Sequence, residues 1–144
     1  MGVNEKLSKD EHGNNVDPSL YRSMIGSFLY LTASRPDICF SVGVCARYQA
    51  LLNQSHLTAV KRIIRYISGT VEFGIWYSSD SNMHLAGYSD ADWVSNIDDQ
   101  KSTSGGCFYL GNNLVTWYRK KQSPISLSTV EAEYHSSKKL LHTD

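Results

Sequence analysis

Apolar residues in the first part of the chain recur every three or four positions, which is the period of one face of a helix. The first stripe predicts a helix from residue 18 to about residue 34, with Asp17 capping free amide groups and Pro18 in the first turn. Arg35 and Pro36 then end it, because the residue before a proline avoids the helical region. The buried face is predicted to contain Leu20, Met24, Ile25, Phe28, Leu29 and Leu31.

Two more helices are predicted before residue 70. Pro36 begins the second, which extends to about residue 52, and Ser55 caps the third, which runs from about 56 to 68 and stops at Gly69. Their apolar faces consist of Ile38, Val42, Cys45 and Tyr48 in the second helix and of Leu57, Val60, Ile64 and Ile67 in the third. The other side of the third helix presents three basic residues that fit either a solvated face or a phosphate-facing surface. They are Lys61, Arg62 and Arg65.

The period changes from helical to strand-like after Gly69, which places a boundary between two units at residues 69 to 73. Alternating residues predict strands at 73 to 77, 83 to 89, 104 to 110 and 114 to 118, with a short edge at 125 to 127. The third and fourth strands form a hairpin across Gly111, Asn112 and Asn113. A run of helices followed by a run of strands predicts an α+β protein.

A last helix is predicted to begin at Ser128. The order Ser128-Thr129-Val130-Glu131 fits a capping box, in which the serine accepts a bond from the third amide and the glutamate reaches back. Glu131 therefore has a structural role. Glu133 points well around the helix from Glu131 and is free for another task.

Composition and charge exclude several classes of site. The 14 Lys and Arg balance the 14 Asp and Glu, so contact with nucleic acid must rely on local basic patches. Cys39, Cys45 and Cys107 lack Cys-x-x-Cys spacing and the histidines lack metal-ligand spacing, which argues against a zinc site or a disulfide framework. The sequence has no recognisable signal peptide or membrane span, so we expect an intracellular protein, cytoplasmic or nuclear, that does not contact a membrane.

Two acidic positions are the candidates for chemistry. Asp90 follows an apolar run where a strand meets a loop, and Glu133 lies on the last helix. Carboxylates at a strand end and on the following helix can converge on divalent cations, which activate water against a phosphodiester. Asp92 either shares the face of Asp90 or caps the turn before Trp93. Ordinary turn acids and solvated helix acids are the alternative interpretation of these positions.

Two further segments bear on nucleic acid. Ser102-Thr103-Ser104-Gly105-Gly106 lacks the Gly-Lys-Ser/Thr signature of a phosphate loop and precedes a strand, so we interpret it as a turn. A compact basic run, Arg119, Lys120 and Lys121, follows the last long strand. It fits equally a contact with a nucleic-acid backbone and a solvated hairpin end.

Six ordered segments between residues 21 and 134 are recognisable together. They are Tyr21-Arg22-Ser23-Met24-Ile25-Gly26-Ser27, Arg35-Pro36-Asp37-Ile38, Ala59-Val60-Lys61-Arg62-Ile63-Ile64-Arg65-Tyr66, Gly87-Tyr88-Ser89-Asp90-Ala91-Asp92-Trp93, Lys101-Ser102-Thr103-Ser104-Gly105 and Leu127-Ser128-Thr129-Val130-Glu131-Ala132-Glu133-Tyr134. In this order they closely resemble the Pol polyprotein of copia-type LTR retrotransposons. The resemblance runs from about Lys6 to Tyr134.

The resemblance implies a domain organisation. Residues 17 to 69 look like the helical thumb and connection region of reverse transcriptase, and residues 70 to 144 look like a truncated ribonuclease H domain. For residues 1 to 16, the polar and charged composition itself predicts a mobile lead-in. The expected fold is thus α+β, with an N-terminal three-helix thumb-like segment followed by an incomplete ribonuclease H-like sheet with one C-terminal helix.

The resemblance also implies a site. Asp90 matches the catalytic aspartate on the first strand of that domain, and Glu133 matches the catalytic glutamate on its helix. In the family, Mg²⁺ (or Mn²⁺) ions held by carboxylates activate water during cleavage of the RNA strand of an RNA-DNA hybrid. The implied partners are such a hybrid or other nucleic acid, contacted by the two basic clusters, and the rest of a Pol polyprotein.

The family pattern continues beyond residue 144, where a further strand would supply another catalytic aspartate. We therefore expect weak metal binding and an isolated chain without nuclease activity. Two alternatives stay open. One is a non-catalytic nucleic-acid-binding or interaction fragment, and the other is a relic reading frame labelled as an effector-like protein.

Overall fold

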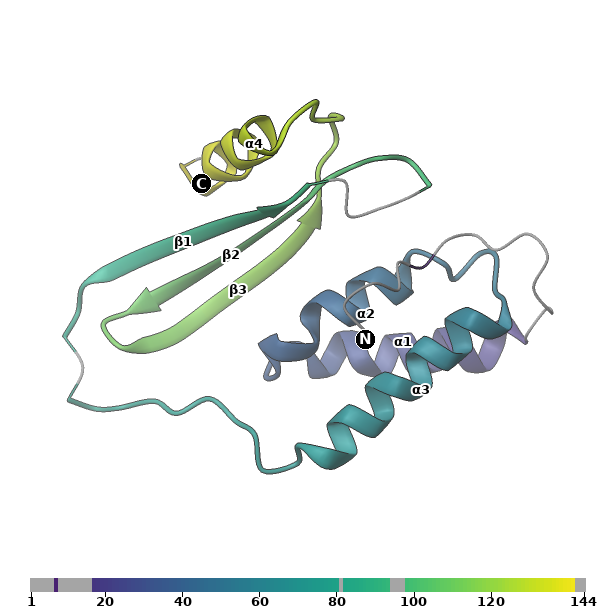
Figure 1. Cartoon of the computed structure of the whole chain (residues 1–144). Helices are drawn as coiled ribbons and strands as arrows, with labels where there is room; N and C mark the ends of the chain where they lie inside the picture. The colour runs from purple at the N-terminus through teal and green to yellow at the C-terminus, as the bar shows by residue number, and fades with distance from the viewer. Residues whose placement is uncertain (1–6, 8–16, 81, 94–97, 142–144) are drawn as a thin grey trace. The chain divides into compact units, whose positions relative to one another are not determined.

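The computed structural model describes residue 7 and residues 17–80, 82–93 and 98–141. The chain forms two compact units, one up to Gly74 and the other from Ile75 (Figure 1). The described part of the first unit is helical, and that of the second is a three-stranded antiparallel sheet with one helix. The α+β class predicted from the sequence is therefore confirmed. The predicted lead-in, residues 1 to 16, lies outside the described residues except for Leu7.

The first unit consists of α1 (Pro18–Leu31), the short 3-10 helix η1 (Pro36–Ile38), α2 (Cys39–Ala46) and α3 (Gln54–Gly69). The Asp17 side chain accepts a hydrogen bond from the Ser19 amide at 2.9 Å, as expected of a cap. The predicted cap of α3, Ser55, is wrong. Asn53 occupies that position, and its amide donates to Nδ1 of the buried His56 at 3.2 Å. The second helix also ends earlier than the predicted residue 52.

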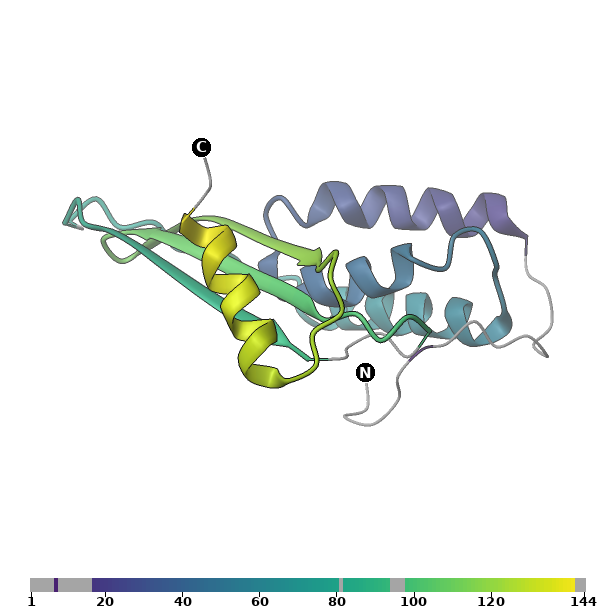
Figure 2. The same cartoon turned by 90° about the horizontal axis from the view of Figure 1, so that it is seen from above.

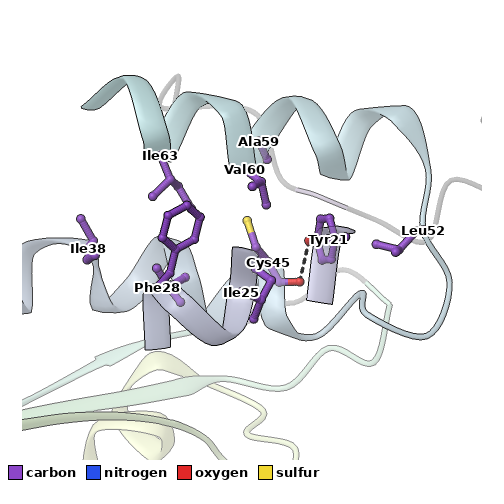
Figure 3. Close-up of a cluster of buried hydrophobic side chains, with 10 residues drawn as sticks. Tyr21, Ile25, Phe28, Ile38, Cys45, Leu52, Ala59, Val60 and Ile63 are labelled. Carbon is purple, nitrogen blue, oxygen red and sulfur yellow. Dashed lines mark hydrogen bonds between the residues drawn. The ribbon is translucent and has the colours of Figure 1, made fainter. Parts of the chain in front are cut away.

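An apolar cluster joins the three helices (Figure 3). Its buried members are Tyr21, Ile25, Phe28, Ile38, Val42, Cys45, Leu52, Ala59, Val60 and Ile63. Two of the predicted positions are wrong, because Leu20 and Leu29 of α1 are 60% and 49% exposed. The buried stripe of α1 instead runs through Tyr21, whose hydroxyl donates to the Cys45 carbonyl at 2.8 Å. That bond lets a tyrosine occupy a core position.

The same one-residue rotation occurs in α3, where Ile63 is buried and the predicted Ile64 is 41% exposed. Across η1 and α2 the predicted apolar side is confirmed through Ile38, Val42 and Cys45. Burial raises the pKa of the Cys45 thiol to about 11, so this cysteine is a neutral core residue.

A polar network ties the start of η1 to the end of α3. The buried Arg35 donates from Nε and Nη2 to the two oxygens of Asp37, at 3.0 and 2.8 Å. It also donates to the carbonyl and the hydroxyl of Thr70, at 3.1 and 2.8 Å. Asp37 accepts a further bond from the Tyr66 hydroxyl at 2.9 Å. Every bond to Asp37 thus favours its ionised form, and the Arg35 guanidinium in particular holds the pKa of that carboxyl below its usual value.

The sheet of the second unit has the order β1-β2-β3. Its strands are β1 (Leu85–Asp92), β2 (Thr103–Leu110) and β3 (Asn113–Lys121), and α4 (Thr129–Leu141) follows. Leu85 pairs with Leu110 and Asp92 with Thr103 across the first two strands. The predicted hairpin is confirmed, with Gly111 in the left-handed region at φ 60°.

Two predicted strands are wrong. Residues 73 to 77 are irregular, although their side chains alternate. Just beyond them, the backbone of Ser78 is bonded by the side-chain amide of Asn113. This amide accepts from the Ser78 amide at 2.8 Å and donates to the Ser78 carbonyl at 3.0 Å. The predicted edge at residues 125 to 127 is likewise irregular.

One face of the sheet accommodates a large side chain over a glycine. A Cβ atom on Gly106 of β2 would lie 2.6 Å from the ring of Tyr118 on the neighbouring strand β3. Real Cβ atoms do not approach other atoms so closely. The absence of a side chain at Gly106 therefore makes the space in which Tyr118 lies.

The Arg35 network gives the first unit a specific dependence on pH. Because the pKa of Asp37 is lowered by folding, its contribution to the free energy of unfolding is present above the unfolded pKa and is lost as pH falls through the lower native value. We expect Asp37→Asn to lower the urea midpoint near neutral pH, and the difference from the unaltered chain to shrink as pH falls below the ordinary pKa of an aspartate. The urea midpoint of each protein is measured by the helical circular dichroism signal at a series of pH values. A constant difference at all pH values would contradict the prediction.

Candidate functional site at the junction of α4 and β1

A buried side chain, Gln122, helps to fix the helix α4 to the sheet. The Gln122 amide nitrogen donates to the Ser104 hydroxyl and to the Ala132 carbonyl, each at 2.9 Å. Its oxygen accepts a bond from the Ser126 hydroxyl at 3.1 Å. Gln122 follows β3, Ser104 lies on β2 and Ala132 on α4, so the carboxamide joins three segments. Figures 1 and 2 show α4 lying along one side of the sheet as a result.

Asp90 lies within β1 at this junction rather than after the strand, because β1 runs to Asp92. The buried Ser136 of α4 donates from Oγ to the Asp90 carbonyl at 2.9 Å. The Asp90 carboxylate is exposed and accepts a bond from the Ala91 amide at 2.9 Å. The strand position and the helix contact together fix the backbone at Asp90.

Glu133 is exposed on α4, three residues before Ser136. At a rise of about 1.5 Å per residue it lies about one turn along the axis from the contact with Asp90. The capping role predicted for Glu131 is confirmed, although its carboxylate bonds the Leu127 amide and not the predicted Ser128 amide. The Glu131 amide donates to Ser128 Oγ at 3.2 Å, and its carboxylate accepts from the Leu127 amide at 2.7 Å. Glu131 is committed to the start of the helix.

The fold thus brings Asp90 and the helix that bears Glu133 to one place. Asp92 instead faces Arg119 of β3, with 3.6 Å between the carboxylate and the guanidinium. Within the described residues, no three His, Cys, Asp or Glu side chains are grouped to hold a metal ion. Asp90 and Glu133 are hard oxygen donors of the type that Mg²⁺ and Mn²⁺ prefer.

The basic run of β3 is largely engaged with acids. Arg119 lies beside Asp92, and the Lys121 ammonium forms an ion pair with Asp99. Burial alone would raise the pKa of Asp99, but hydrogen bonds from Lys121 and from the Lys101 amide outweigh it and hold the pKa below its usual value. Lys120 is exposed. This surface is therefore less positive than its sequence indicates.

The basic residues of α3 lie on an exposed helix surface. Lys61, Arg62 and Arg65 are all exposed, and Val60 and Ile63 bury the other side of the helix. A hollow of about 260 Å³ lies beside them in the first unit. It is lined by Asp37, Ile38, Ser41, Arg62, Ile63 and Tyr66. Arg62 thus borders a recess between α2 and α3, whereas Lys61 and Arg65 extend along the helix surface.

Comparison with known proteins decides the family. The chain is 40% identical over 94% of its length to a retrovirus-related Pol polyprotein from transposon RE1 of Arabidopsis thaliana, and 38% identical over 94% to that from transposon RE2. It spans 9% of each of those polyproteins. The chain belongs to the Pol family of copia-type retrotransposons.

One shorter relative of this Pol-family chain is named as an effector and not as a Pol polyprotein. The secreted RxLR effector protein 161 of Plasmopara viticola is 37% identical over 79% of the chain and 81% of its own length. Searches with protein-family models and among solved structures gave no match. None of the helices in the described residues combines the length and apolar character needed to cross a membrane.

The residues that build the junction in this Pol-family chain are not among those predicted from the sequence. Gln122, Ala132 and Ser136 give no motif of their own, because a single glutamine after a strand is normally solvated. The four-residue interval between the small residues Ala132 and Ser136 marks one face of a helix, and both are fully buried. This spacing of two small residues is the feature of the sequence from which the buried face of α4 could have been predicted.

Removing the Gln122 carboxamide should loosen α4. Gln122→Ala would leave Ser104 and the Ala132 carbonyl without this donor, and we expect a loss of about 1–3 kcal/mol in the free energy of unfolding of the second unit. Hydrogen exchange at the amides of α4 measures it. Ser123→Ala, at an exposed neighbouring position, is the control and should change stability by less than about 0.5 kcal/mol. Equal protection of α4 in both variants would contradict the assignment.

Proposed function

We propose that the second unit is the opening part of a ribonuclease H domain of a Pol polyprotein. Its ancestral role is cleavage of the RNA strand of an RNA-DNA hybrid during reverse transcription. The observation that supports this most directly is the contact of Ser136 with the Asp90 carbonyl, which holds the helix of Glu133 on the strand of Asp90. The printed names of the long relatives, retrovirus-related Pol polyproteins, support the same context.

Asp90 and Glu133 are the residues that would hold Mg²⁺ or Mn²⁺. Both carboxylates are exposed, and their oxygens suit hard cations. When bound, such ions activate water and stabilise the leaving oxygen at a phosphodiester. Ser136 and Gln122 have a positioning role, because they help to fix the two backbone segments from which these carboxylates project.

The complete site requires more than these two side chains. A two-metal site uses several carboxylates, and the Asp90 carboxylate is here also bonded to the Ala91 amide. We therefore assign the remaining ligands to other parts of a Pol polyprotein. By itself, the chain should bind nucleic acid without cleaving it.

A cleavage assay tests this assignment. The chain and its Asp90→Asn variant are incubated with an RNA-DNA hybrid in Mg²⁺ and, separately, in Mn²⁺. We expect the same background from both proteins, because two ligands hold the metal weakly. Cleavage of the RNA strand that disappears in Asp90→Asn would contradict the proposal that the chain alone is inactive and would support the ligand role. Cleavage unchanged by Asp90→Asn and by Glu133→Gln would contradict the site itself.

For binding, we propose the exposed basic surface of α3 as the principal contact with a nucleic-acid backbone. Lys61, Arg62 and Arg65 are all exposed on one helix, with Lys61 and Arg65 extending along its surface. Two of the three basic residues of β3 instead lie beside Asp92 and Asp99. A phosphate contact releases counterions, so each one adds to the salt dependence of binding. Basic residues that already lie beside acids contribute less to this salt dependence.

Two charge-matched variants compare the surfaces. Replacing Lys61, Arg62 and Arg65 by alanine should weaken binding to a hybrid and reduce the slope of log K against log salt by about two to three. The same replacement of Arg119, Lys120 and Lys121 removes three charges as well and should change the slope less. Fluorescence anisotropy over a range of salt concentrations measures both. Affinity without salt dependence, or a larger effect of the β3 variant, would contradict the proposal.

A further inference from the structure

The hollow between α2 and α3 is small and has an apolar inner surface. Its volume is about 260 Å³, which is less than the roughly 300 to 1,000 Å³ of sites that hold drug-sized ligands. Ile38 and Ile63, both buried members of the apolar cluster, line it from opposite elements (Figure 3). A cavity of this size and lining suits a single planar ring system.

Tyr66 is the aromatic side chain that lines this hollow. It is 43% exposed, yet its hydroxyl donates to Asp37 at 2.9 Å and the Arg35 guanidinium lies 6.0 Å from the centre of its ring. These contacts restrict the ring before any ligand arrives, so stacking a ligand on it costs little side-chain entropy. Exposed aromatic rings are the surfaces on which unpaired nucleic-acid bases stack.

Asp37 can recognise one edge of such a base. A carboxylate has about four lone-pair sites, and three hydrogen bonds, two from Arg35 and one from Tyr66, occupy sites on Asp37. The side chain is still 30% exposed, which leaves room for one further donor. The exocyclic amino groups of adenine, cytosine and guanine are such donors, whereas thymine and uracil present a carbonyl oxygen instead.

Positive charge lies next to the hollow on the same helix. Arg62 lines the hollow one turn before Tyr66, and Lys61 and Arg65 extend along the exposed surface of α3. A nucleic-acid backbone that follows Lys61 and Arg65 therefore passes beside the hollow. A base within a duplex cannot enter, because its neighbours cover its faces and its partner occupies its pairing edge.

We propose that the hollow between α2 and α3 takes one unpaired base of a nucleic acid, stacked on Tyr66, with its exocyclic amino group donating to Asp37. The occupant is an adenine, cytosine or guanine in a single-stranded segment. This inference rests on the proposed contact of α3 with a nucleic-acid backbone. It adds a base preference, which phosphate contacts by themselves do not supply.

Matched extensions of one hybrid test the hollow separately from the helix surface. The full chain is titrated, with fluorescence anisotropy as the readout, against a blunt RNA-DNA hybrid and against the same hybrid with a short single-stranded extension. The extension carries either cytosines or abasic sites, so that the number of phosphates is constant. The blunt hybrid measures the contacts of α3 with phosphates. We expect the cytosine extension to bind about tenfold more tightly than the abasic one.

Replacing Tyr66 tests the stacking surface. Tyr66→Leu keeps an apolar side chain but removes the ring, so it should abolish the gain from the bases while the blunt hybrid binds as before. Tyr66→Phe keeps the ring and should retain more of the gain than Tyr66→Leu. Tyr77→Leu makes the same change at an exposed tyrosine of the second unit and should retain the gain in full.

A change of base tests Asp37. Thymine matches cytosine in size but lacks the amino group, so a thymine extension should bind about tenfold more weakly than a cytosine extension. Asp37→Asn supplies an amide that can donate to a carbonyl oxygen as well as accept from an amino group. The preference for cytosine over thymine should therefore disappear in that variant. Circular dichroism shows whether each variant is folded.

The possible failures are distinguishable. Equal binding of abasic and cytosine extensions, with the blunt hybrid still bound, would overturn the base site and leave the contact of α3 intact. A gain that survives in Tyr66→Leu, or a cytosine preference that persists in Asp37→Asn, would overturn the roles of these residues. Failure to bind any of the three nucleic acids would overturn the contact of α3 and this inference with it.

Discussion

The second unit depends on a single buried carboxamide. Gln122 has to be bonded on both its nitrogen and its oxygen, because a buried amide without partners costs far more than the bonds themselves contribute. This requirement selects its neighbours: a hydroxyl at Ser104, a hydroxyl at Ser126 and a helix carbonyl at Ala132. Satisfying this side chain helps to place α4, and the bond from Ser136 to the Asp90 carbonyl then sets the relation of Glu133 to Asp90.

The two units are held together by different physical means. In the first, ten buried side chains from the helices and the segments between them form a continuous apolar cluster, and the Arg35 network joins η1 to the end of α3. In the described part of the second unit, the buried positions are mostly small or polar, while Tyr88, Leu127 and Val130 are largely exposed. A unit that leaves so much apolar surface in water is suited to association with further protein surface.

Periodicity predicted the helices because their apolar faces repeat over many residues, so one wrong position changes little. It missed the rotation of α1 toward Tyr21, because the bond from a tyrosine hydroxyl to the Cys45 carbonyl is a tertiary contact that no local pattern contains. It also predicted a strand at residues 73 to 77, where the side chains alternate but the backbone is irregular. For the candidate site, sequence identified the carboxylates and the capping role of Glu131, whereas Gln122 and Ser136 became visible only with the packing of α4.

The space over Gly106 has a consequence for how such a sequence can vary. A methyl group at Gly106 would collide with the Tyr118 ring, whereas a smaller residue at position 118 would leave a void. Neither position can change alone without cost, although they lie on different strands. Divergent copies of this sequence should therefore exchange the glycine and the aromatic residue as a pair, and the two positions would covary as spatial neighbours do.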